Sequence, residues 1–368
     1  MIELSRPAWA EIDLDAIAHN VQLTRSLIGP RVKLFGCVKA DAYGCGRVPV
    51  ARAFAAAGVD ALAVADPYDV PLLRQAGLEL PILLFASTLP EQAAAVATLR
   101  NVIVSVHDFP SLAAFAALPR SVDVYLKIDC GAARYGFIES QWREAFAALR
   151  RASNLRVRGI YAHPIDPEDR DAARRQGRTM DRACVLAAES GLQGFDRLFA
   201  SSRFILGYPD LHYTAVDPGR LLLGHLPGEW AGMAQTRPVV RAIKSRIAQI
   251  QEHPDGAALS GVQHGGAVRA AVMPVGFSDG FPAAKLHDVL VCGQRAPVIN
   301  YPRGIESTVI DVTDVAEAEV GSEVVLLGRQ GDQEITPAEL ASSFGCSLFE
   351  LMHRITRNTH KRFLGGGG

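Results

Sequence analysis

The chain has 368 residues, of which 49% are hydrophobic and 21% charged, and its formal net charge is −1. The length exceeds that of a typical domain and the composition is that of a globular protein, so we expect two domains or a barrel with an added domain. The near-neutral charge argues against nucleic-acid binding and against an acidic membrane surface, because both require a basic excess.

The ends of the chain and its cysteines bear on location. No secretory signal is expected, because the start of the chain lacks a basic region followed by an apolar stretch, and no apolar run is long enough to cross a bilayer. The six cysteines are scattered without paired metal-ligand spacing. We therefore expect reduced thiols in a cytoplasmic protein and no metal site. The terminal glycines 365–368 resemble a linker.

The first part of the chain alternates short apolar, β-branched runs with longer Ala-rich segments of helical periodicity. The predicted strands are residues 34–39, 61–65, 82–85, 102–106, 122–128, 158–162, 198–201 and 216–223. The predicted helices include residues 48–57, 140–152 and 172–190. Eight strands alternating with helices indicate a (β/α)8 barrel of the TIM type over residues 1–227, although Pro218 and Gly219 interrupt the last strand.

From residue 228 the helical pattern fades, and short strand-like runs are separated by Gly, Pro and Asp turns. These runs are residues 239–249, 268–275, 288–291, 308–312 and 323–327, with a helical signal near 337–343. We therefore expect a smaller β-rich domain over residues 228–364. The first few residues of the chain are expected to pair with it.

Unusual polar residues fall where the barrel strands end, which is where barrels of this type carry their chemistry. They are Lys39, Lys127 with Arg134 shortly after it, His163 and Ser202. The loops after the last two strands hold Ser202 and the run Pro218-Gly219-Arg220. A hydroxyl and free backbone N–H groups at these loops suit a phosphate dianion.

Lys39 ends the apolar strand that begins at residue 34. Partial desolvation of an amine favours its neutral, nucleophilic form, which can form a Schiff base with an aldehyde. A lysine that extends from the barrel rim into solvent occupies the same position. Position alone leaves both interpretations open.

The string around Lys39 resembles the cofactor-attachment motif of the alanine racemase family, whose members use pyridoxal 5'-phosphate (PLP). Further matches follow in the family's order along nearly the whole chain. The matching strings are residues 9–17, 38–46, 126–136, 159–163, 276–280, 311–314 and 327–332. The resemblance implies a fold-type III PLP enzyme, with a barrel and a β domain, assembled as a head-to-tail homodimer that acts on a small amino acid.

The resemblance also implies roles for individual residues. Lys39 would carry the cofactor as a Schiff base, and His163 would lie against its ring. Arg134 would hold the phenolic oxygen of the cofactor and the carboxylate of the substrate. Lys127 matches a lysine that family members often carbamylate. The cofactor phosphate would be held by residues from three loops, which are Tyr43, Ser202, Gly219 and Arg220.

Three positions depart from the family pattern. The tyrosine that serves as the second base in family racemases has no counterpart near Gly261, and His264 is a candidate substitute. Asp217 stands where the family places an arginine beside the pyridine nitrogen. A carboxylate there favours a protonated ring, which is a stronger electron sink. Ile305 and Glu306 replace the family's Met-Asp pair in the substrate-binding region.

These departures leave three functions open. The first is an enzyme that labilises a bond at Cα with one base, as in aldol cleavage, decarboxylation or transamination. The second is a genuine alanine or broad-specificity racemase. The third is a non-catalytic PLP-binding protein, although such proteins resemble the barrel alone.

Overall fold

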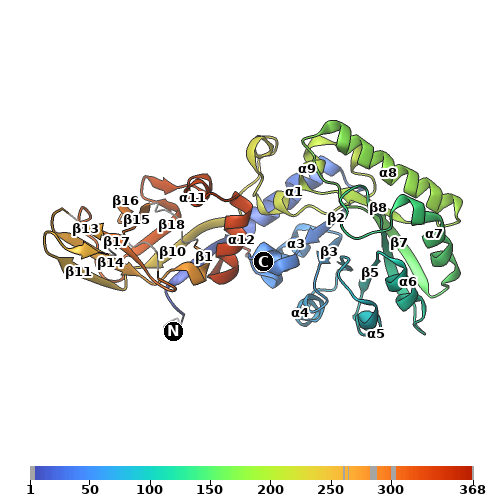
Figure 1. Cartoon of the computed structure of the whole chain (residues 1–368), viewed down its shortest axis with the longest axis horizontal. Helices are drawn as coiled ribbons and strands as arrows, with labels where there is room; N and C mark the ends of the chain where they lie inside the picture. Colours follow the sequence, from blue (N-terminus) through green and yellow to red (C-terminus); the bar gives the residue numbers. More distant parts are fainter. Residues whose placement is uncertain (1–4, 260–261, 264, 282–287, 300–303, 367–368) are drawn as a thin grey trace. The chain divides into compact units, whose positions relative to one another are not determined.

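The computed structural model describes residues 5–259, 262–263, 265–281, 288–299 and 304–366 (Figure 1). It divides into two compact units. The barrel unit comprises residues 16–42 and 47–237, and the β unit comprises residues 1–15, 43–46 and 238–368. The barrel and the β-rich part predicted from the sequence are both confirmed.

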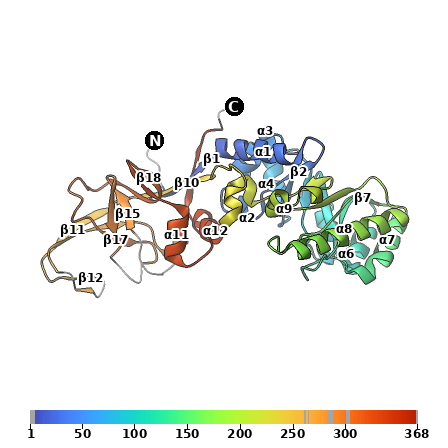
Figure 2. The same ribbon diagram turned by 90° about the horizontal axis from the view of Figure 1, so that it is seen from above.

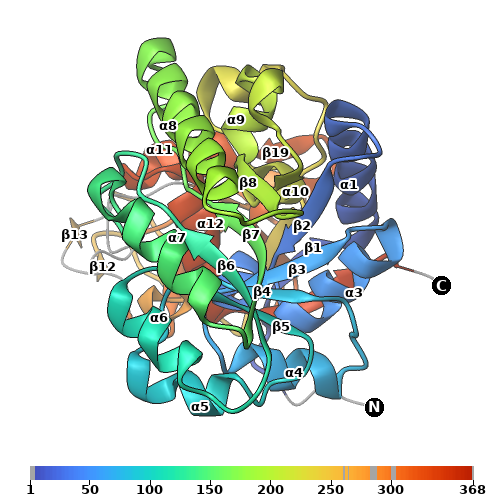
Figure 3. The ribbon, with the colours of Figure 1, turned by 90° about the vertical axis from the view of Figure 1, so that its right-hand side faces the viewer.

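The barrel unit is built around a closed barrel of parallel strands, in which the last strand pairs with the first (Figure 3). The strands are β2 (Lys33–Cys37), β3 (Ala61–Val64), β4 (Ile82–Leu84), β5 (Val102–Val106), β6 (Val122–Lys127), β7 (Leu155–Tyr161), β8 (Asp196–Ala200) and β9 (Ala215–Val216). Most of their residues are buried. Such continuous burial is typical of parallel strands that are covered on both faces, and it explains why they read as apolar runs.

Helices follow the strands and surround the barrel (Figure 3). They are α1 (Leu14–Ile28), α3 (Arg47–Ala57), α4 (Asp69–Gln75), α5 (Ala93–Val96), α6 (Phe109–Ala116), α7 (Trp142–Arg151), α8 (Arg170–Glu189), α9 (Ser202–Gly207) and α10 (Arg220–Leu223). Side-chain caps begin two of them. Asp108 accepts a hydrogen bond from the N–H of Ser111 at α6, and Asp169 accepts from the N–H of Ala172 at α8.

Aromatic side chains fill the interior of the barrel. The ring centre of Tyr125 lies 6.1 Å from that of Phe35 and 6.3 Å from that of Tyr161. Tyr125 and Tyr161 are both almost fully buried. The interior of the barrel is therefore a packed core rather than a channel.

The prediction of a strand over residues 216–223 is wrong beyond its first residue. β9 ends at Val216, and residues Arg220–Leu223 form the short helix α10. Pro218 has no N–H to continue the strand ladder. Gly224, with φ 69°, then ends the helix in the left-handed conformation.

The β unit consists mainly of a seven-stranded sheet with the order β16-β15-β18-β10-β1-β20, in which β19 also pairs with β18. A three-stranded sheet has the order β11-β14-β17, and β12 pairs with β13. The strands in the described residues are β1 (Ala8–Asp13), β10 (Val240–Arg246), β11 (Gln249–His253), β12 (Ala258–Leu259), β13 (Val262–Gln263), β14 (Val268–Met273), β15 (Asp288–Val291), β16 (Gln294–Pro297), β17 (Thr308–Asp311), β18 (Glu323–Gln330), β19 (Gln333–Ile335) and β20 (His360–Leu364). The N-terminal strand β1 is internal, because it pairs with β10 on one side and β20 on the other.

Two helices complete the β unit, α11 (Pro337–Phe344) and α12 (Leu348–Asn358), and they pack against each other (Figure 2). The hydroxyl of Thr336 accepts from the N–H of Glu339, and that of Ser347 accepts from the N–H of Glu350. Both are N-caps, which satisfy backbone donors at the start of a helix. Within the described residues, no helix combines the length and apolarity needed to span a bilayer.

Candidate active site

Side chains from four strand ends surround one pocket in the barrel unit. The pocket is lined by Phe85, Ala86, Lys127, Arg134, Tyr135, Tyr161, His163 and Asp217. These residues lie at or just beyond the carboxyl ends of β4, β6, β7 and β9. This is the end of a parallel barrel at which chemistry is expected.

Lys39 lies at the same end, directly after β2. Its Nζ is 5.4 Å from the ring centre of Phe85, a residue of the pocket. The four residues that follow, Ala40 to Tyr43, all have φ between 51° and 58°. A left-handed run of non-glycine residues costs roughly 1–2 kcal/mol per residue, and such strain concentrates at functional sites.

Lys127 ends β6 and is buried, with its Nζ 4.5 Å from the ring centre of Tyr161. Burial and the nearby Arg134 cation, opposed by the Asp217 carboxylate, together lower the pKa of Lys127 to about 8. An appreciable fraction of the amine is therefore neutral near pH 8.

Arg134 is carried by a loop that folds back onto the end of β6. The Asp129 carboxylate accepts hydrogen bonds from the N–H groups of Gly131 and Ala132, both at 2.9 Å. The N–H of Phe137 then donates to the carbonyl of Lys127 at 3.0 Å and closes the loop. The loop thus places the guanidinium at the pocket.

His163 follows β7, and its surroundings keep the imidazole neutral. Burial, together with the nearby cations of Arg134, Lys39 and Lys127, lowers the pKa of His163 to about 3. A neutral ring beside three cations is suited to packing against a flat ligand or to accepting a hydrogen bond, but not to taking up a proton near neutral pH.

Asp217 follows β9 and brings a carboxylate to this cationic pocket. Its Oδ1 is inaccessible to solvent and has no hydrogen-bond partner within the described part of the chain. Burial, only partly opposed by the cations of Lys39 and Lys127, raises the pKa of Asp217 to about 7. A buried acceptor without a donor is costly, which indicates that a ligand donor belongs there.

Ser202 begins α9 at the end of β8 and is buried. Its Oγ accepts hydrogen bonds from the N–H groups of Gly219 at 3.1 Å and Leu221 at 3.0 Å. The hydroxyl and these two amides lie together at the start of α10, beside Arg220. This cluster combines the donors that an anionic group requires.

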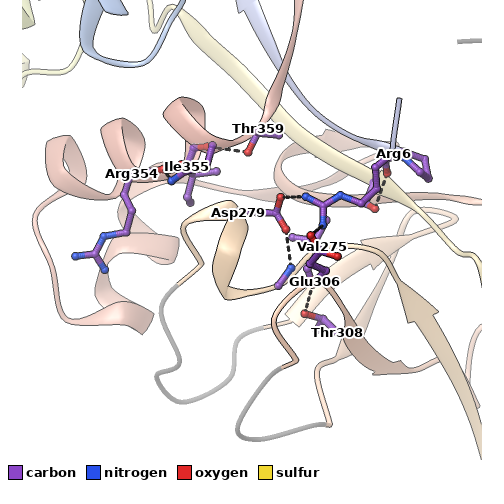
Figure 4. Close-up of polar contacts among 12 residues, drawn as sticks. Arg6, Val275, Asp279, Glu306, Thr308, Arg354, Ile355 and Thr359 are labelled. Carbon is purple, nitrogen blue, oxygen red and sulfur yellow. Dashed lines mark hydrogen bonds and ion pairs between the residues drawn. The ribbon is translucent and has the colours of Figure 1, made fainter. Parts of the chain in front are cut away.

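Three predicted site residues belong to the β unit and one cannot be placed. The Tyr43 ring packs edge-on against Phe349, with ring centres 5.2 Å apart. Ile305 is 62% exposed, and the Glu306 side chain contacts Arg6 in the cluster drawn in Figure 4. His264 lies outside the described residues.

The sequence analysis missed Tyr161 and its partner. The Tyr161 hydroxyl lies 2.7 Å from the Ser105 Oγ and accepts a hydrogen bond from the N–H of Ala86 at 3.2 Å. The Tyr161 ring lines the pocket next to Lys127, and the bond to Ser105 holds it in place. The period-two alternation along β7, which puts Gly159, Tyr161 and His163 on one side, was the available signal.

Comparison with known families identifies both parts of the chain. The family profile described as "Alanine racemase, N-terminal domain" matches residues 12–227. The profile described as "Alanine racemase, C-terminal domain" matches residues 240–363.

Individual relatives match over nearly their full length. The alanine racemase of Syntrophobacter fumaroxidans is 33% identical over 98% of each chain, and that of Desulfovibrio desulfuricans is 32% identical over 96% of each. The solved alanine racemase of Clostridium difficile 630 has a TM-score of 0.90 at 26% identity and covers 98% of this chain and 97% of that one. The Bacillus anthracis structure, an alanine racemase with bound L-Ala-P, also has a TM-score of 0.90 at 26% identity, with 99% and 97% covered.

Proposed function

Because the chain belongs to the alanine racemase family, we propose that it racemises a small amino acid at Cα, with alanine as the first substrate to test. Enzymes of this family use pyridoxal 5'-phosphate. When bound, this cofactor withdraws electrons from Cα of an attached amino acid and so acidifies its α proton. The residues of the pocket fit such a group in three respects.

The observation that carries racemisation is the family match over both parts of the chain, and cofactor binding is supported by Lys39 and Asp217 at the same end of the barrel. The cofactor has an aldehyde, which reacts with an amine, and a basic ring nitrogen, which needs a partner when protonated. Lys39 supplies the amine, and the unpartnered Oδ1 of Asp217 supplies a buried acceptor. The Ser202 hydroxyl supplies a donor for a phosphate, and the N–H groups of Gly219 and Leu221, which donate to the Ser202 Oγ in this structure, would turn to the phosphate when it binds.

The remaining side chains support substrate binding and proton transfer. The Arg134 guanidinium would hold the substrate carboxylate, since its planar fork matches a carboxylate in two-point contact. The Lys39 amine would take the α proton on one face of the substrate. Tyr161 and Phe85 would exclude water from below, since Tyr161 is buried and bonded to Ser105.

Racemisation also requires a proton donor on the opposite face. We propose that the β unit of a second copy supplies this face in a homodimer. As the family resemblance implies, Tyr43 would contribute to binding of the cofactor phosphate, and Ile305 and Glu306 would contribute to substrate binding. His264 remains our predicted second base. The six cysteines carry no disulfide in the described residues, which is consistent with the cytoplasmic location we propose.

One-base chemistry is the second candidate, and Asp217 is the observation that favours it. A carboxylate at the ring nitrogen strengthens the electron sink, whereas the family arginine weakens it. The curated relatives are named alanine racemase, and nothing in them indicates a different reaction. A non-catalytic PLP carrier is disfavoured, because the match extends through the C-terminal domain.

The test is to incubate the PLP-loaded enzyme with L- and D-alanine and a panel of other amino acids in D₂O, with proton NMR and chiral analysis. We expect loss of the α-proton signal with inversion in both directions. Exchange with retention, or formation of an aldehyde, amine or keto acid, would establish one-base chemistry instead. Covalent PLP that persists in Lys39→Ala after borohydride reduction would refute the attachment site.

A further inference from the structure

Two loops of the β unit are joined into one hydrogen-bonded platform (Figure 4). They are residues 276–280 and residues 304–307, which we call the paired loops. The N–H of Phe277 donates to the carbonyl of Gly304 at 3.3 Å, and the N–H of Ser278 donates to the carbonyl of Ile305 at 3.0 Å. The two loops therefore keep a fixed register relative to each other.

The close approach of the paired loops depends on a glycine. A Cβ at Gly276 would collide with the carbonyl oxygens of Gly304 and Ile305. At the base of the loops, the buried Thr308 hydroxyl donates to the carbonyl of Val275 at 2.6 Å. The backbone contact at Gly276 and the Thr308 hydrogen bond together restrict sliding of the two loops past each other.

Arg6 ties both loops to the N-terminal segment. Its guanidinium donates to the Oδ1 of Asp279 in one loop and lies 3.7 Å from the Oε1 of Glu306 in the other. Asp279 is only 1% exposed, and its second oxygen accepts from the N–H of Gly276 at 2.9 Å. Because Asp279 is buried and uses both oxygens, Arg6 is the cation that compensates its charge.

The platform presents two large apolar side chains that are more than half exposed. Phe277 is 51% exposed and Ile305 is 62% exposed. Large apolar side chains held outward on a fixed backbone are suited to line a binding surface. Under the proposed function, Ile305 and Glu306 contact the substrate, so the position of the platform sets the space available to it.

We propose that Arg6 is a positioning residue that fixes the paired loops and thereby sets the size of substrate that the enzyme accepts. This inference rests on the proposed function. Arg6 contacts no reacting atom in it. Its effect is transmitted through Asp279 in one loop and Glu306 in the other.

The test compares PLP-loaded Arg6→Gln, Arg6→Lys and wild-type enzymes on amino acids of increasing side-chain size. We expect Arg6→Gln to change the ratio of the KM for larger amino acids to the KM for alanine by about tenfold. The kcat for alanine should change little, because loosening a positioning segment affects substrate binding before it affects the chemical step. Arg6→Lys should recover part of the effect, since an ammonium can pair with Asp279 but cannot bridge both carboxylates. Arg295→Gln, which removes an ion pair with Glu339 elsewhere in the β unit, is the matched control.

Amide hydrogen exchange on the same enzymes reports the platform directly. Faster exchange in residues 276–280 and 304–307 of Arg6→Gln, with no change in Arg295→Gln, would support the positioning role. If all variants turn over the amino acids with the same KM ratios as the wild type, the positioning role of Arg6 is overturned while the proposed function stands. A wild-type enzyme that turns over none of the amino acids would overturn the proposed function, and the role of Arg6 in selection with it.

Discussion

The absence of a side chain at Gly159 makes room for the ring of Tyr125. A Cβ at Gly159 would lie 2.5 Å from the Cζ of Tyr125 and 2.6 Å from its Cε2. Tyr125 cannot easily withdraw, because its hydroxyl donates to the Asp196 carboxylate at 2.7 Å. The two residues belong to the neighbouring strands β6 and β7, so the fit between them is built into the barrel wall.

We therefore predict that Gly159→Ala destabilises the protein by about 1–3 kcal/mol, the usual cost of overpacking a filled core. The measurement is the free energy of unfolding in urea. Gly232→Ala is the control, because a Cβ there would meet no heavy atom within 4 Å among the described residues. Equal stability of the two variants would show that the barrel interior relaxes around the added methyl group.

The barrel could be predicted from the sequence because its strands are buried on both sides and read as short apolar runs between helical segments. The bounds of the last barrel strand could not be predicted, since the run around Leu221 is apolar for another reason. It forms the buried face of α10 rather than a strand. The first residues were expected to pair with the β domain, but the bounds of β1 were not predicted, because its partners, β10 and β20, lie more than 200 residues away in the sequence.

The lowered pKa of Lys127 leads to a prediction about carbamylation. The neutral amine attacks carbon dioxide at carbon and releases a proton, which leaves a carbamate anion near the Arg134 cation. In the presence of ¹³C-bicarbonate we expect a carbamate signal by ¹³C NMR that grows as the pH rises through about 8, the pKa of this amine. The signal should be absent in Lys127→Met and retained in Lys33→Met, a half-exposed lysine paired with Asp196. A wild-type spectrum without the signal would mean that Lys127 stays an amine.

His163 makes a contribution to stability that depends on pH. Its pKa is lowered to about 3 in the folded protein from an ordinary value of 6.5. As the pH falls below 6.5 the unfolded chain takes up this proton first, so stability is lost between about pH 6.5 and pH 3 and is fully present above that range. We predict that cofactor-free His163→Gln loses less stability than the wild type between pH 6.5 and 4 in urea denaturation. Parallel curves for the two proteins would contradict a neutral buried imidazole.

The site could be predicted in outline, since a polar residue at the end of an apolar barrel strand is recognisable in sequence. Lys39, Lys127 and His163 were found in this way, and the structure brings them together. The partner of Tyr161 could not be predicted, because Ser105 lies inside an ordinary apolar strand. Its role appears only when β5 and β7 are placed on the two sides of β6 in the barrel. The charge environment of Asp217 likewise depends on distances that no linear pattern contains.

Asp217 gives the prediction that separates the two candidate reactions. In PLP-loaded enzyme with a ¹⁵N-labelled pyridine ring, we expect the ¹⁵N chemical shift of a protonated ring nitrogen, because the buried carboxylate stabilises the positive charge. Asp217→Asn should return the shift to that of a neutral ring and slow exchange of the alanine α proton by about a hundredfold, the usual loss when a group that stabilises developing charge is removed. Covalent attachment at Lys39 should persist in both enzymes.

Asp217→Arg is the informative control, because it restores the residue found at this position in the family pattern. If racemisation survives in Asp217→Arg while any aldehyde, amine or keto-acid product of the wild type disappears, the carboxylate is what admits those side reactions. If the wild-type ring nitrogen is already neutral, Asp217 does not pair with it, and its unpartnered Oδ1 must receive its hydrogen bond from another part of the ligand. In that case one-base chemistry would rest only on the missing counterpart of the family tyrosine near Gly261, and racemisation would remain supported by the family match.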